Sequence, residues 1–380
     1  MKIAMICTES LPAPAINGGA IQIMIDGVSK FVAEAFQLTV FSITDPELAE
    51  HEWVDRVEYI RFPKDQYEIK VYHSIQETYY DLIHVFNRPH NVLAYKQASP
   101  ESKFVLGLHN DMLSDEKISI HKGTEVIQIV DHIVTISHFI KQKVVTRFSE
   151  AVHKTTVVYS GVDLEKHHPS WDNTGREVRE CYRKKYNLTG KKVLLFVGRL
   201  TKTKGPHLLI KAMKYVLKKY SNAILVIVGG KWFSDDGLNQ YVKSLYSLAK
   251  PLQDKIIFTK YVPPDEIPSL LLMADVFICS SQWEEPLARV HYEAMASGTP
   301  IITTNRGGNA EVITHKMNGY IVDDYKKPLS YAKAIDFYFS QPEMTSWIIR
   351  KGREFVEANF QFKHVSRRLT DVYETCFHKN

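Results

Sequence analysis

Two glutamates spaced eight residues apart stand in an otherwise apolar segment. Glu285 and Glu293 lie in EEPLARVHYEAMASGTPIITT (284–304), which predicts a loop, a helix from about Leu287 to Ser297 and a buried strand. Both carboxylates then fall near the N-terminal end of that helix, where unpaired backbone amides bind anions and polar ligands. A structural role also fits, with Glu285 interacting with the helix dipole and Glu293 in a partly buried salt bridge.

A cluster of cations follows the apolar run VLLFV. In GRLTKTKGPHLLIKAM (198–213) a helix is expected to begin near Pro206, because proline is favoured at the first helical position. Arg199, Lys202 and Lys204 would then gather at the positive end of a helix dipole, which is unfavourable unless an anion such as phosphate binds there. The alternative interpretation is a solvated loop that is basic by chance.

Two further loops carry weaker signals. Gly18 and Gly19 stand directly before an amphipathic stretch, and paired glycines allow a ligand to approach the backbone closely. His109 follows the apolar run KFVLGL and begins the triplet His-Asn-Asp, a position from which an imidazole could contact a substrate. A plain loop and a structural histidine are the alternatives.

Short apolar runs alternate with amphipathic stretches along the whole chain. Runs such as AILVIVGG (223–230) are continuously apolar, as in parallel strands covered by helices on both faces. The 380 residues exceed the usual size of one core. We therefore predict an α/β protein of two doubly wound Rossmann-like domains, residues 1–170 and 171–360, with a polar linker candidate at 164–192. Ligands of such sheets bind beyond the carboxyl ends of the strands, so a cleft between the domains is the expected site.

Composition and missing motifs exclude several classes of function. A net charge of +5, with 44% apolar and 24% charged residues, fits a globular protein with an anionic ligand and does not suggest a nucleic-acid partner. No run approaches the roughly 20 apolar residues of a membrane span, and four scattered cysteines indicate reduced thiols and a cytoplasmic location. The dinucleotide, P-loop, nucleophile-elbow and Asp-x-Asp motifs are absent, and His167–His168 is interpreted as a solvated linker. We therefore predict no metal and no cofactor.

Taken together, these motifs resemble those of the family-4 glycosyltransferases. The resemblance covers most of the chain in the same order: NGG, HND, SGVDLEKHHP, GRLTKTKG, VIVGG, ADVFICSS and EEPLARVHYEAMASGTPII. It implies the GT-B fold, in which two Rossmann-like domains face each other across a cleft and a final helix, here 361–380, returns to the first domain. It also implies a retaining, metal-free transfer of a sugar from a nucleotide-sugar donor, with a UDP-sugar favoured, to an unidentified acceptor.

The resemblance also implies roles for individual residues. Arg199 and Lys204 would bind the diphosphate, Glu293 the ribose hydroxyls and Glu285 the hydroxyls of the transferred sugar, while His109 would lie beside the reacting sugar. The expected catalytic set is therefore His109, Arg199, Lys204 and Glu285. The expected donor-binding residues are Gly18, Gly19, Arg199, Lys204, Glu285, Leu287, Ala288, Arg289, Val290 and Glu293, in which the backbone around Arg289–Val290 would hold the distal phosphate.

This chain departs from the family pattern at several positions. Leu287–Ala288 replaces the usual Phe-Gly, Arg289 and His291 occupy usually apolar positions, and Lys260 replaces a usual glycine near the expected base pocket. These changes concern the identity of the donor more than the fold.

The acceptor and the setting of the reaction stay open at this stage. EAMASGTPIITTNRGGNAEVI resembles the spore-coat branch of the bacterial enzymes. The acceptor could be a glycan, a lipid or a small molecule, and peripheral membrane or spore-coat association is left open. The alternative function is a non-catalytic scaffold or sugar-binding coat protein. A pyridoxal-phosphate phosphorylase, which would need a longer chain, is disfavoured.

Overall fold

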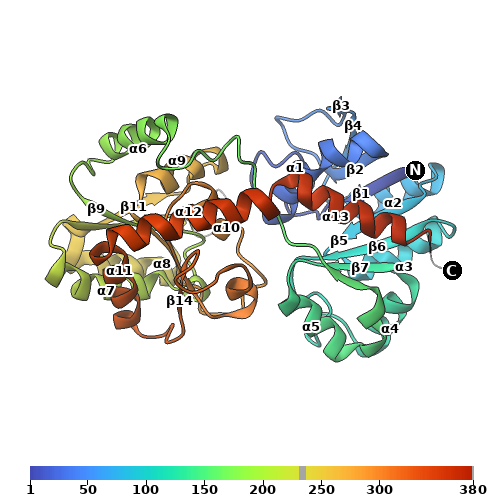
Figure 1. The fold of residues 1–380 in the computed structure, drawn as a ribbon. Helices are drawn as coiled ribbons and strands as arrows, with labels where there is room; N and C mark the ends of the chain where they lie inside the picture. Colours follow the sequence, from blue (N-terminus) through green and yellow to red (C-terminus); the bar gives the residue numbers. More distant parts are fainter. Residues whose placement is uncertain (231–236, 379–380) are drawn as a thin grey trace. The chain divides into compact units, whose positions relative to one another are not determined.

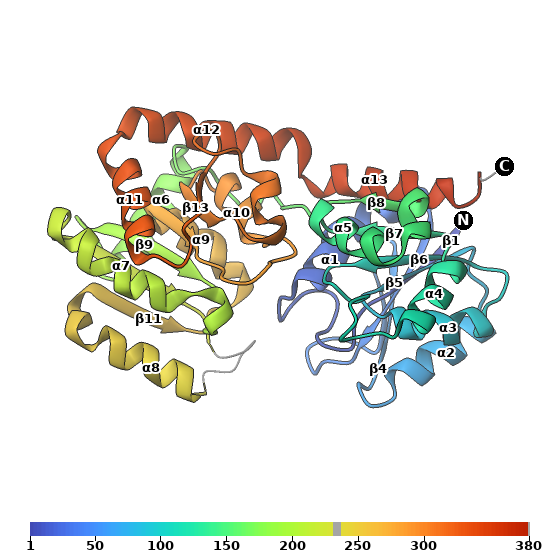
Figure 2. The same ribbon diagram turned by 90° about the horizontal axis from the view of Figure 1, so that it is seen from below.

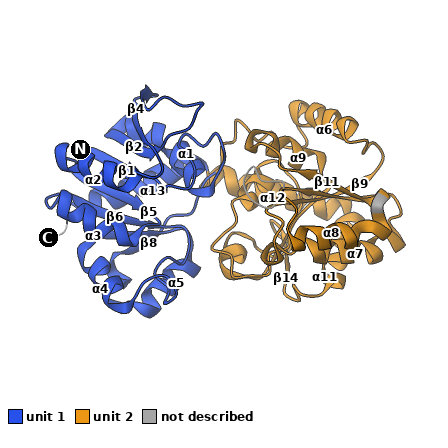
Figure 3. Ribbon diagram, turned by 180° about the vertical axis from the view of Figure 1, so that it is seen from behind, with its two compact units in different colours: residues 1–161, 361–380 blue, residues 162–360 orange. Residues whose placement is uncertain are grey.

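The computed structural model describes residues 1–230 and 237–378, which form two compact units (Figure 3). Unit 1 comprises Met1–Gly161 and Gln361–Asn380, and unit 2 comprises Val162–Phe360. The units therefore divide at residue 161, before the sequence-based limit of 170. Residues 379–380 of the expected final helix lie outside the described residues. Each unit is described by itself below, and the expected cleft between them stays a prediction.

Unit 1 is built on a mainly parallel sheet. Within the described residues it has eight strands in the order β3-β4-β2-β1-β5-β6-β7-β8, and only the β3–β4 pair is antiparallel. The strands are β1 (Lys2–Ile6), β2 (Gln37–Ile43), β3 (His51–Val54), β4 (Val57–Phe62), β5 (Leu82–Phe86), β6 (Lys103–Leu108), β7 (His132–Thr135) and β8 (Thr155–Val157). The helices are α1 (Ala20–Ala35), α2 (Tyr67–Glu77), α3 (Pro89–Ala98), α4 (Ile120–Ile129), α5 (His138–Arg147) and α13 (Phe362–Thr375).

Unit 2 repeats the architecture with a fully parallel sheet. Its six described strands have the order β11-β10-β9-β12-β13-β14. They are β9 (Lys192–Val197), β10 (Ala223–Val228), β11 (Ile256–Lys260), β12 (Val276–Cys279), β13 (Ile301–Thr304) and β14 (Tyr320–Val322). The helices are α6 (Asn173–Lys185), α7 (Pro206–Lys219), α8 (Gln240–Ala249), α9 (Ile267–Met273), α10 (Val290–Ala296), α11 (Pro328–Ser340) and α12 (Pro342–Asn359). In each unit helices lie on both sides of the sheet (Figure 2), which confirms the predicted pair of Rossmann-like α/β domains.

The predicted linker 164–192 is a folded part of unit 2. It contains α6, whose Arg179 and Arg183 both bind the carboxylate of Asp275, the residue before β12. Ahead of α6, the Ser170 amide donates to the Ser297 carbonyl at 3.0 Å. The polar composition of segment 164–192 therefore reflects the arginine side chains that hold a surface helix against the sheet. The segment is not an unstructured linker.

Strand order reverses direction once in each sheet. From β1 the chain builds outward through β2 and β4, and from β5 it builds the other way through β6, β7 and β8. In unit 2 the same reversal lies between β9 and β12. At such a switch point the loops after the two central strands turn away to opposite faces and leave a crevice at the carboxyl ends, which is where ligands of doubly wound sheets bind.

The last helix belongs to unit 1. Helix α13 lies against α1 (Figure 1), where Gly27 leaves room for the ring of Phe362, since a Cβ at that glycine would come within 2.5 Å of it. The hydroxyl of Tyr373 lies 2.8 Å from Nδ1 of the buried His84 on β5. None of the helices in the described residues is long and apolar enough to cross a membrane.

The packing of α13 yields a stability prediction. Leu369 is 0% exposed in the unit 1 core, so Leu369→Ala should lower the free energy of unfolding by about 2–5 kcal/mol. Asp371→Ala changes an exposed residue of the same helix and should stay within about 0.5 kcal/mol of wild type. Urea unfolding monitored by circular dichroism compares the two. Equal stability of both variants would show that α13 is not an integral part of the unit 1 core.

Candidate functional site

A buried ion pair spans the switch point of unit 2. The Nζ atom of Lys204, which follows β9, lies 2.7 Å from each carboxylate oxygen of Glu285, which follows β12. The side chains are 19% and 9% exposed, respectively. Two residues that the sequence predicts for one site, although 81 positions apart, are thus in direct contact. The contact places a cation and an anion at the carboxyl edge of adjacent strands.

Backbone contacts between the two loops fix this pair. The Ser280 hydroxyl donates to the Lys204 carbonyl at 2.9 Å, and the Gln282 amide donates to the Thr203 carbonyl at 2.6 Å. Gly205 adopts a left-handed conformation (φ 74°), and a Cβ there would lie 2.2 Å from the Ser280 carbonyl oxygen. Only glycine allows this approach. Helix α7 then begins at Pro206, as the sequence predicts.

Three donors hold the Glu285 carboxylate. Besides Lys204, the Ser281 hydroxyl donates to Oε2 at 2.7 Å and the Trp283 indole N–H donates to it at 2.8 Å. Burial raises the pKa of Glu285, but the Lys204 ammonium and these hydrogen bonds outweigh it and keep the pKa below its usual value of 4.5. Glu285 is therefore a fixed, ionised group whose orientation is set before any ligand arrives.

Arg199 precedes Lys204 in the loop that follows β9. Its neighbour Leu200 donates its amide to the Gly230 carbonyl at 2.8 Å, which ties this part of the loop to the end of β10. Arg199 itself is half-buried. The two cations that the sequence assigns to a diphosphate therefore follow the same strand, one toward β12 and one toward β10.

Glu293 forms a partly buried salt bridge. This is the structural role that the sequence offered as the alternative to ligand binding. Arg289 Nη2 donates to Glu293 Oε1 at 2.9 Å, one helical turn apart, and both side chains are mostly buried. Nearby, His167 is only 6% exposed, so the interpretation of this residue as solvated linker is wrong. Burial lowers the pKa of His167, and the Glu293 carboxylate opposes that shift. Its neighbour His168 is half-buried.

The turn at Leu287–Ala288 differs from expectation. Helix α10 begins at Val290 and not near Leu287. The Ala288 amide donates to Asn309 Oδ1 at 3.1 Å, and its carbonyl lies 2.7 Å from Nδ1 of His291, whose Nε2 contacts the Thr303 hydroxyl. Burial lowers the pKa of His291 to about 4, so the ring is neutral and donates to the carbonyl. The amide of Ala288, one of the expected donor-binding residues, therefore already has a partner.

The predicted residues of unit 1 lie at the carboxyl edge of its own sheet. Gly18 and Gly19 adopt positive φ angles of 77° and 94° immediately before α1. A Cβ at Gly19 would meet Gln22 Oε1 at 2.4 Å, and the amide of that glutamine side chain holds the loop by donating to the Leu11 carbonyl. His109 is buried after β6. Unit 1 thus gathers three of the predicted residues along one edge, and their roles stay predictions.

Sequence analysis missed an ion pair at the switch point of unit 1. Arg88, after β5, donates its Nε to Glu9 Oε2, after β1, at 2.8 Å, and a second nitrogen binds the other oxygen. Burial raises the pKa of Glu9, but Arg88 outweighs it and leaves the pKa lowered. In the loop after β5, Asn87 Oδ1 accepts the amide of His109, which follows β6, at 2.7 Å. The available signal was the position of both residues directly after apolar runs.

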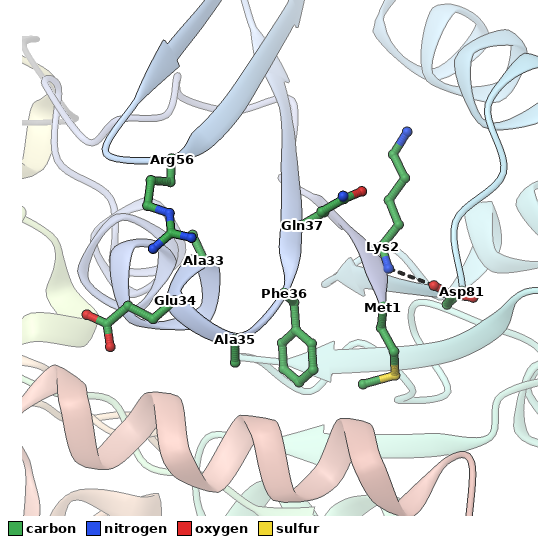
Figure 4. Close-up of a pocket in the computed structure, with 9 residues that line it drawn as sticks. All are labelled: Met1, Lys2, Ala33, Glu34, Ala35, Phe36, Gln37, Arg56 and Asp81. Carbon is green, nitrogen blue, oxygen red and sulfur yellow. Dashed lines mark hydrogen bonds between the residues drawn. The ribbon is translucent and has the colours of Figure 1, made fainter.

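A pocket of about 400 Å³ lies at the opposite edge of the unit 1 sheet. Figure 4 shows Met1 and Gln37, from the starts of β1 and β2, together with Arg56 and Asp81 around it. The Lys2 amide donates to Asp81 Oδ2 at 2.6 Å. The pocket holds none of the predicted site residues. Within residues 1–230 and 237–378 no three His, Cys, Asp or Glu side chains are grouped as metal ligands, and the metal-free reaction stays a prediction.

Comparisons with known proteins identify the relatives of both units. The model of group 1 glycosyl transferases matches residues 178–355, and the model of glycosyltransferase family 4 matches residues 18–166. "Putative glycosyltransferase YtcC" of Bacillus subtilis (strain 168) is 56% identical over 375 residues, which cover 99% of this chain and 92% of the relative. Spore coat protein SA of the same organism is 46% identical over 374 residues, covering 98% and 99%.

Solved structures share the fold across both units. HepE from Anabaena in complex with UDP has a TM-score of 0.80 at 21% identity and covers 99% of this chain and 100% of its own. Sucrose-phosphate synthase from Thermosynechococcus elongatus has a TM-score of 0.80 at 19% identity and covers 99% of each chain.

The Lys204–Glu285 pair yields a pH-dependent prediction. Lys204→Met should lower stability by about 3–5 kcal/mol near neutral pH, because it leaves a buried carboxylate without its cation. In wild type the lowered Glu285 pKa gives a stabilisation that is complete above pH 4.5 and is lost as the pH falls through the folded pKa. In the variant burial is the largest remaining influence and raises that pKa, so the difference from wild type should shrink as the pH falls.

Urea unfolding between about pH 4 and pH 7 measures this difference. The control is Lys204→Met combined with Glu285→Gln, which removes the charge and should abolish the pH dependence of the difference. A destabilisation by Lys204→Met that is constant with pH would contradict the assignment.

Proposed function

The chain belongs to the family-4 glycosyltransferases, and from that membership we propose that it transfers a sugar from a UDP-sugar to a hydroxyl acceptor, with retention and without a metal. The enzyme class follows from the family, and the architecture is that of its GT-B relatives. The donor, the stereochemistry, the metal-free site and the residue roles are our proposal. The observation that carries it is the buried contact of Lys204 with Glu285 across the unit 2 switch point.

The two cations after β9 suit the leaving diphosphate. Cleavage of the sugar–phosphate bond leaves negative charge on the diphosphate, and preorganised cations stabilise that charge most strongly where water is excluded. Lys204 is largely buried and fixed by Glu285, while the half-buried Arg199 stands earlier in the same loop. Together they can neutralise two phosphate groups without a divalent ion.

Glu285 suits the hydroxyls of the transferred sugar. An ionised carboxylate can only accept hydrogen bonds, and sugar hydroxyls are donors. Because Lys204 contacts both Glu285 oxygens, the sugar and its phosphate would be held by directly connected groups. Such a connection aligns the bond that breaks.

Glu293 and the residues of unit 1 complete the proposed donor site. Arg289 holds one oxygen of Glu293, which leaves a positioned carboxylate for the ribose hydroxyls. Gly18 and Gly19 offer backbone without side chains toward the phosphates, and His109 would stand beside the reacting sugar. The amides of Arg289 and Val290, and not that of Ala288, are the candidates for the distal phosphate.

The proposed chemistry is attack of the acceptor on the same face from which the diphosphate leaves. The acceptor oxygen bonds to the anomeric carbon, the bond from that carbon to the phosphate oxygen breaks, and the acceptor proton passes to a phosphate oxygen. The scheme requires no carboxylate nucleophile, which suits a Glu285 side chain already committed to three donors.

A uridine donor is favoured within this proposal. HepE, which shares the fold, is described in complex with UDP and with UDP-glucose. The acceptor is a glycan, a lipid or a small molecule that carries a hydroxyl. We place the protein in the cytoplasm, with spore-coat or peripheral membrane association as a second setting, since one relative is named a spore coat protein.

A non-catalytic coat component is the second candidate. It is favoured by the spore coat relative and by the Ala288 amide, which Asn309 already occupies. The two candidates differ in chemistry, because a scaffold binds the donor without cleaving it.

The donor site predicts two binding defects. Lys204→Ala and Glu293→Ala should each weaken UDP binding roughly ten- to hundredfold, because each removes a charged partner of the ligand. Isothermal titration calorimetry measures the affinity, and circular dichroism verifies the fold. Lys219→Ala is the control, since it changes an exposed lysine at the far end of α7. Wild-type affinity in both site variants would refute the assigned roles.

A ligand panel tests the donor and the enzyme together. Ligands that bind the native state raise its melting temperature with affinity and concentration, so UDP and a matching UDP-sugar should give larger shifts than GDP or ADP. The wild-type protein should then release UDP from the UDP-sugar faster than the Glu285→Gln variant does. Binding without any release of UDP would favour the scaffold.

A further inference from the structure

Lys260 ends β11 in an unusual backbone conformation. Its φ is 67°, in the left-handed region where a side chain meets steric hindrance and glycine does not. One extra residue in β11, between the partners of Ile227 and Val228, brings Lys260 opposite Val228, the last residue of β10. Such bulges redirect a side chain, and strained residues are concentrated at functional sites.

A continuous edge of backbone joins Lys260 to the cations after β9. The Gly229 amide donates to the Lys260 carbonyl at 2.9 Å, and the Gly230 carbonyl accepts the amide of Leu200, the neighbour of Arg199. The order along this edge is therefore Glu285 after β12, Lys204 and Arg199 after β9, and Lys260 after β11. Two strand spacings of about 4.8 Å separate the ends of β9 and β11.

This order gives the donor a direction within unit 2. On the proposed function, on which this inference rests, the sugar lies at Glu285 and the diphosphate extends from Lys204 to Arg199. With the ribose held by Glu293, the base is then the part of the nucleoside that extends toward the ends of β10 and β11. Among the described residues, none forms an ion pair or hydrogen bond with the exposed Lys260 amine. As far as residues 1–230 and 237–378 are concerned, the amine is available to a ligand that reaches this edge.

We propose that Lys260 reads the base of the donor nucleotide and selects bases that carry a carbonyl oxygen, and not an amino group, at position 4 of a pyrimidine or position 6 of a purine. An ammonium group can only donate hydrogen bonds. Uracil presents a carbonyl oxygen where cytosine presents an amino group, and guanine and adenine differ in the same way. An amino group opposite Lys260 would place two donors against each other. Lys260 thus favours UDP over CDP and GDP over ADP, beyond what the phosphates contribute.

Two substitutions separate the charge of Lys260 from its backbone strain. Lys260→Met removes the ammonium and keeps a side chain at a positive φ, whereas Lys260→Gly removes both. Both variants should lose about tenfold in UDP and GDP affinity and change CDP and ADP affinity little. Lys260→Gly alone should also raise the melting temperature of the free protein, by roughly 2–4 °C, because the strain is relieved.

The matched control is Lys316→Gly. Lys316 is an exposed lysine of unit 2 with a φ of 60°, in a turn after β13 that holds no predicted donor residue. This variant tests strain relief without a change at the site, so its nucleotide affinities should equal those of wild type.

Isothermal titration calorimetry of the wild-type protein and of these variants with UDP, CDP, GDP and ADP measures the selectivity for the base. A loss confined to UDP and GDP supports base reading. An equal loss for all four nucleotides would assign Lys260 to the phosphates and overturn the proposal, as would unchanged affinities. If the wild-type protein bound none of the four, the proposed function itself would fail, which is a different result from an unselective Lys260.

Discussion

The contact between the Lys204 ammonium and the Glu285 carboxylate is the interaction on which the unit 2 site depends. Removing two charges from water is costly, and the cost is offset only when geometry and further hydrogen bonds are good. Ser281 and Trp283 supply those bonds. Backbone secures the other side of Glu285, since its carbonyl accepts the Gly308 amide at 2.8 Å. A Cβ at Gly307 would lie 2.1 Å from the same oxygen, so the close approach of these two backbone segments requires glycine. The backbone of Glu285 is thus held by the loop that contains Gly307, and its carboxylate by Lys204.

In both units an ion pair links the two loops at the switch point of the sheet. A strand reversal opens a crevice between two central strands, and an ion pair bridges the loops above it. In unit 2 the pair is Lys204 with Glu285, and in unit 1 it is Arg88 with Glu9. Lysine contacts the carboxylate with one compact ammonium group, whereas the planar fork of arginine binds the two oxygens with separate nitrogens. The architecture thus repeats, while the two crevices differ in the chemistry they offer.

Much of the fold could be predicted because its signals are local. AILVIV forms β10 because an unbroken apolar run rich in β-branched residues suits a strand covered on both faces, and Pro206 opens α7 because its fixed φ suits a helix start. Long-range contacts carry no such signal. The link between Glu9 and Arg88 spans 79 positions. The apparent linker is a helix anchored to Asp275 by arginines, and His167 is buried by residues that are distant in the sequence.

The substitutions at the second loop of the site illustrate the same limit. Read singly, Ala288, Arg289 and His291 are three unrelated departures at a turn that should bind phosphate. In the structure the Ala288 carbonyl faces His291, whose other nitrogen contacts Thr303 on β13, while Arg289 pairs with Glu293. Ala288 and His291 are therefore connected by a hydrogen bond, and interacting positions contribute non-additively to stability and binding. Asn309 adds a fixed partner for the Ala288 amide. The loop is consequently a preorganised structure, in which His291 and Asn309 hold the backbone of Ala288 and Arg289 holds Glu293.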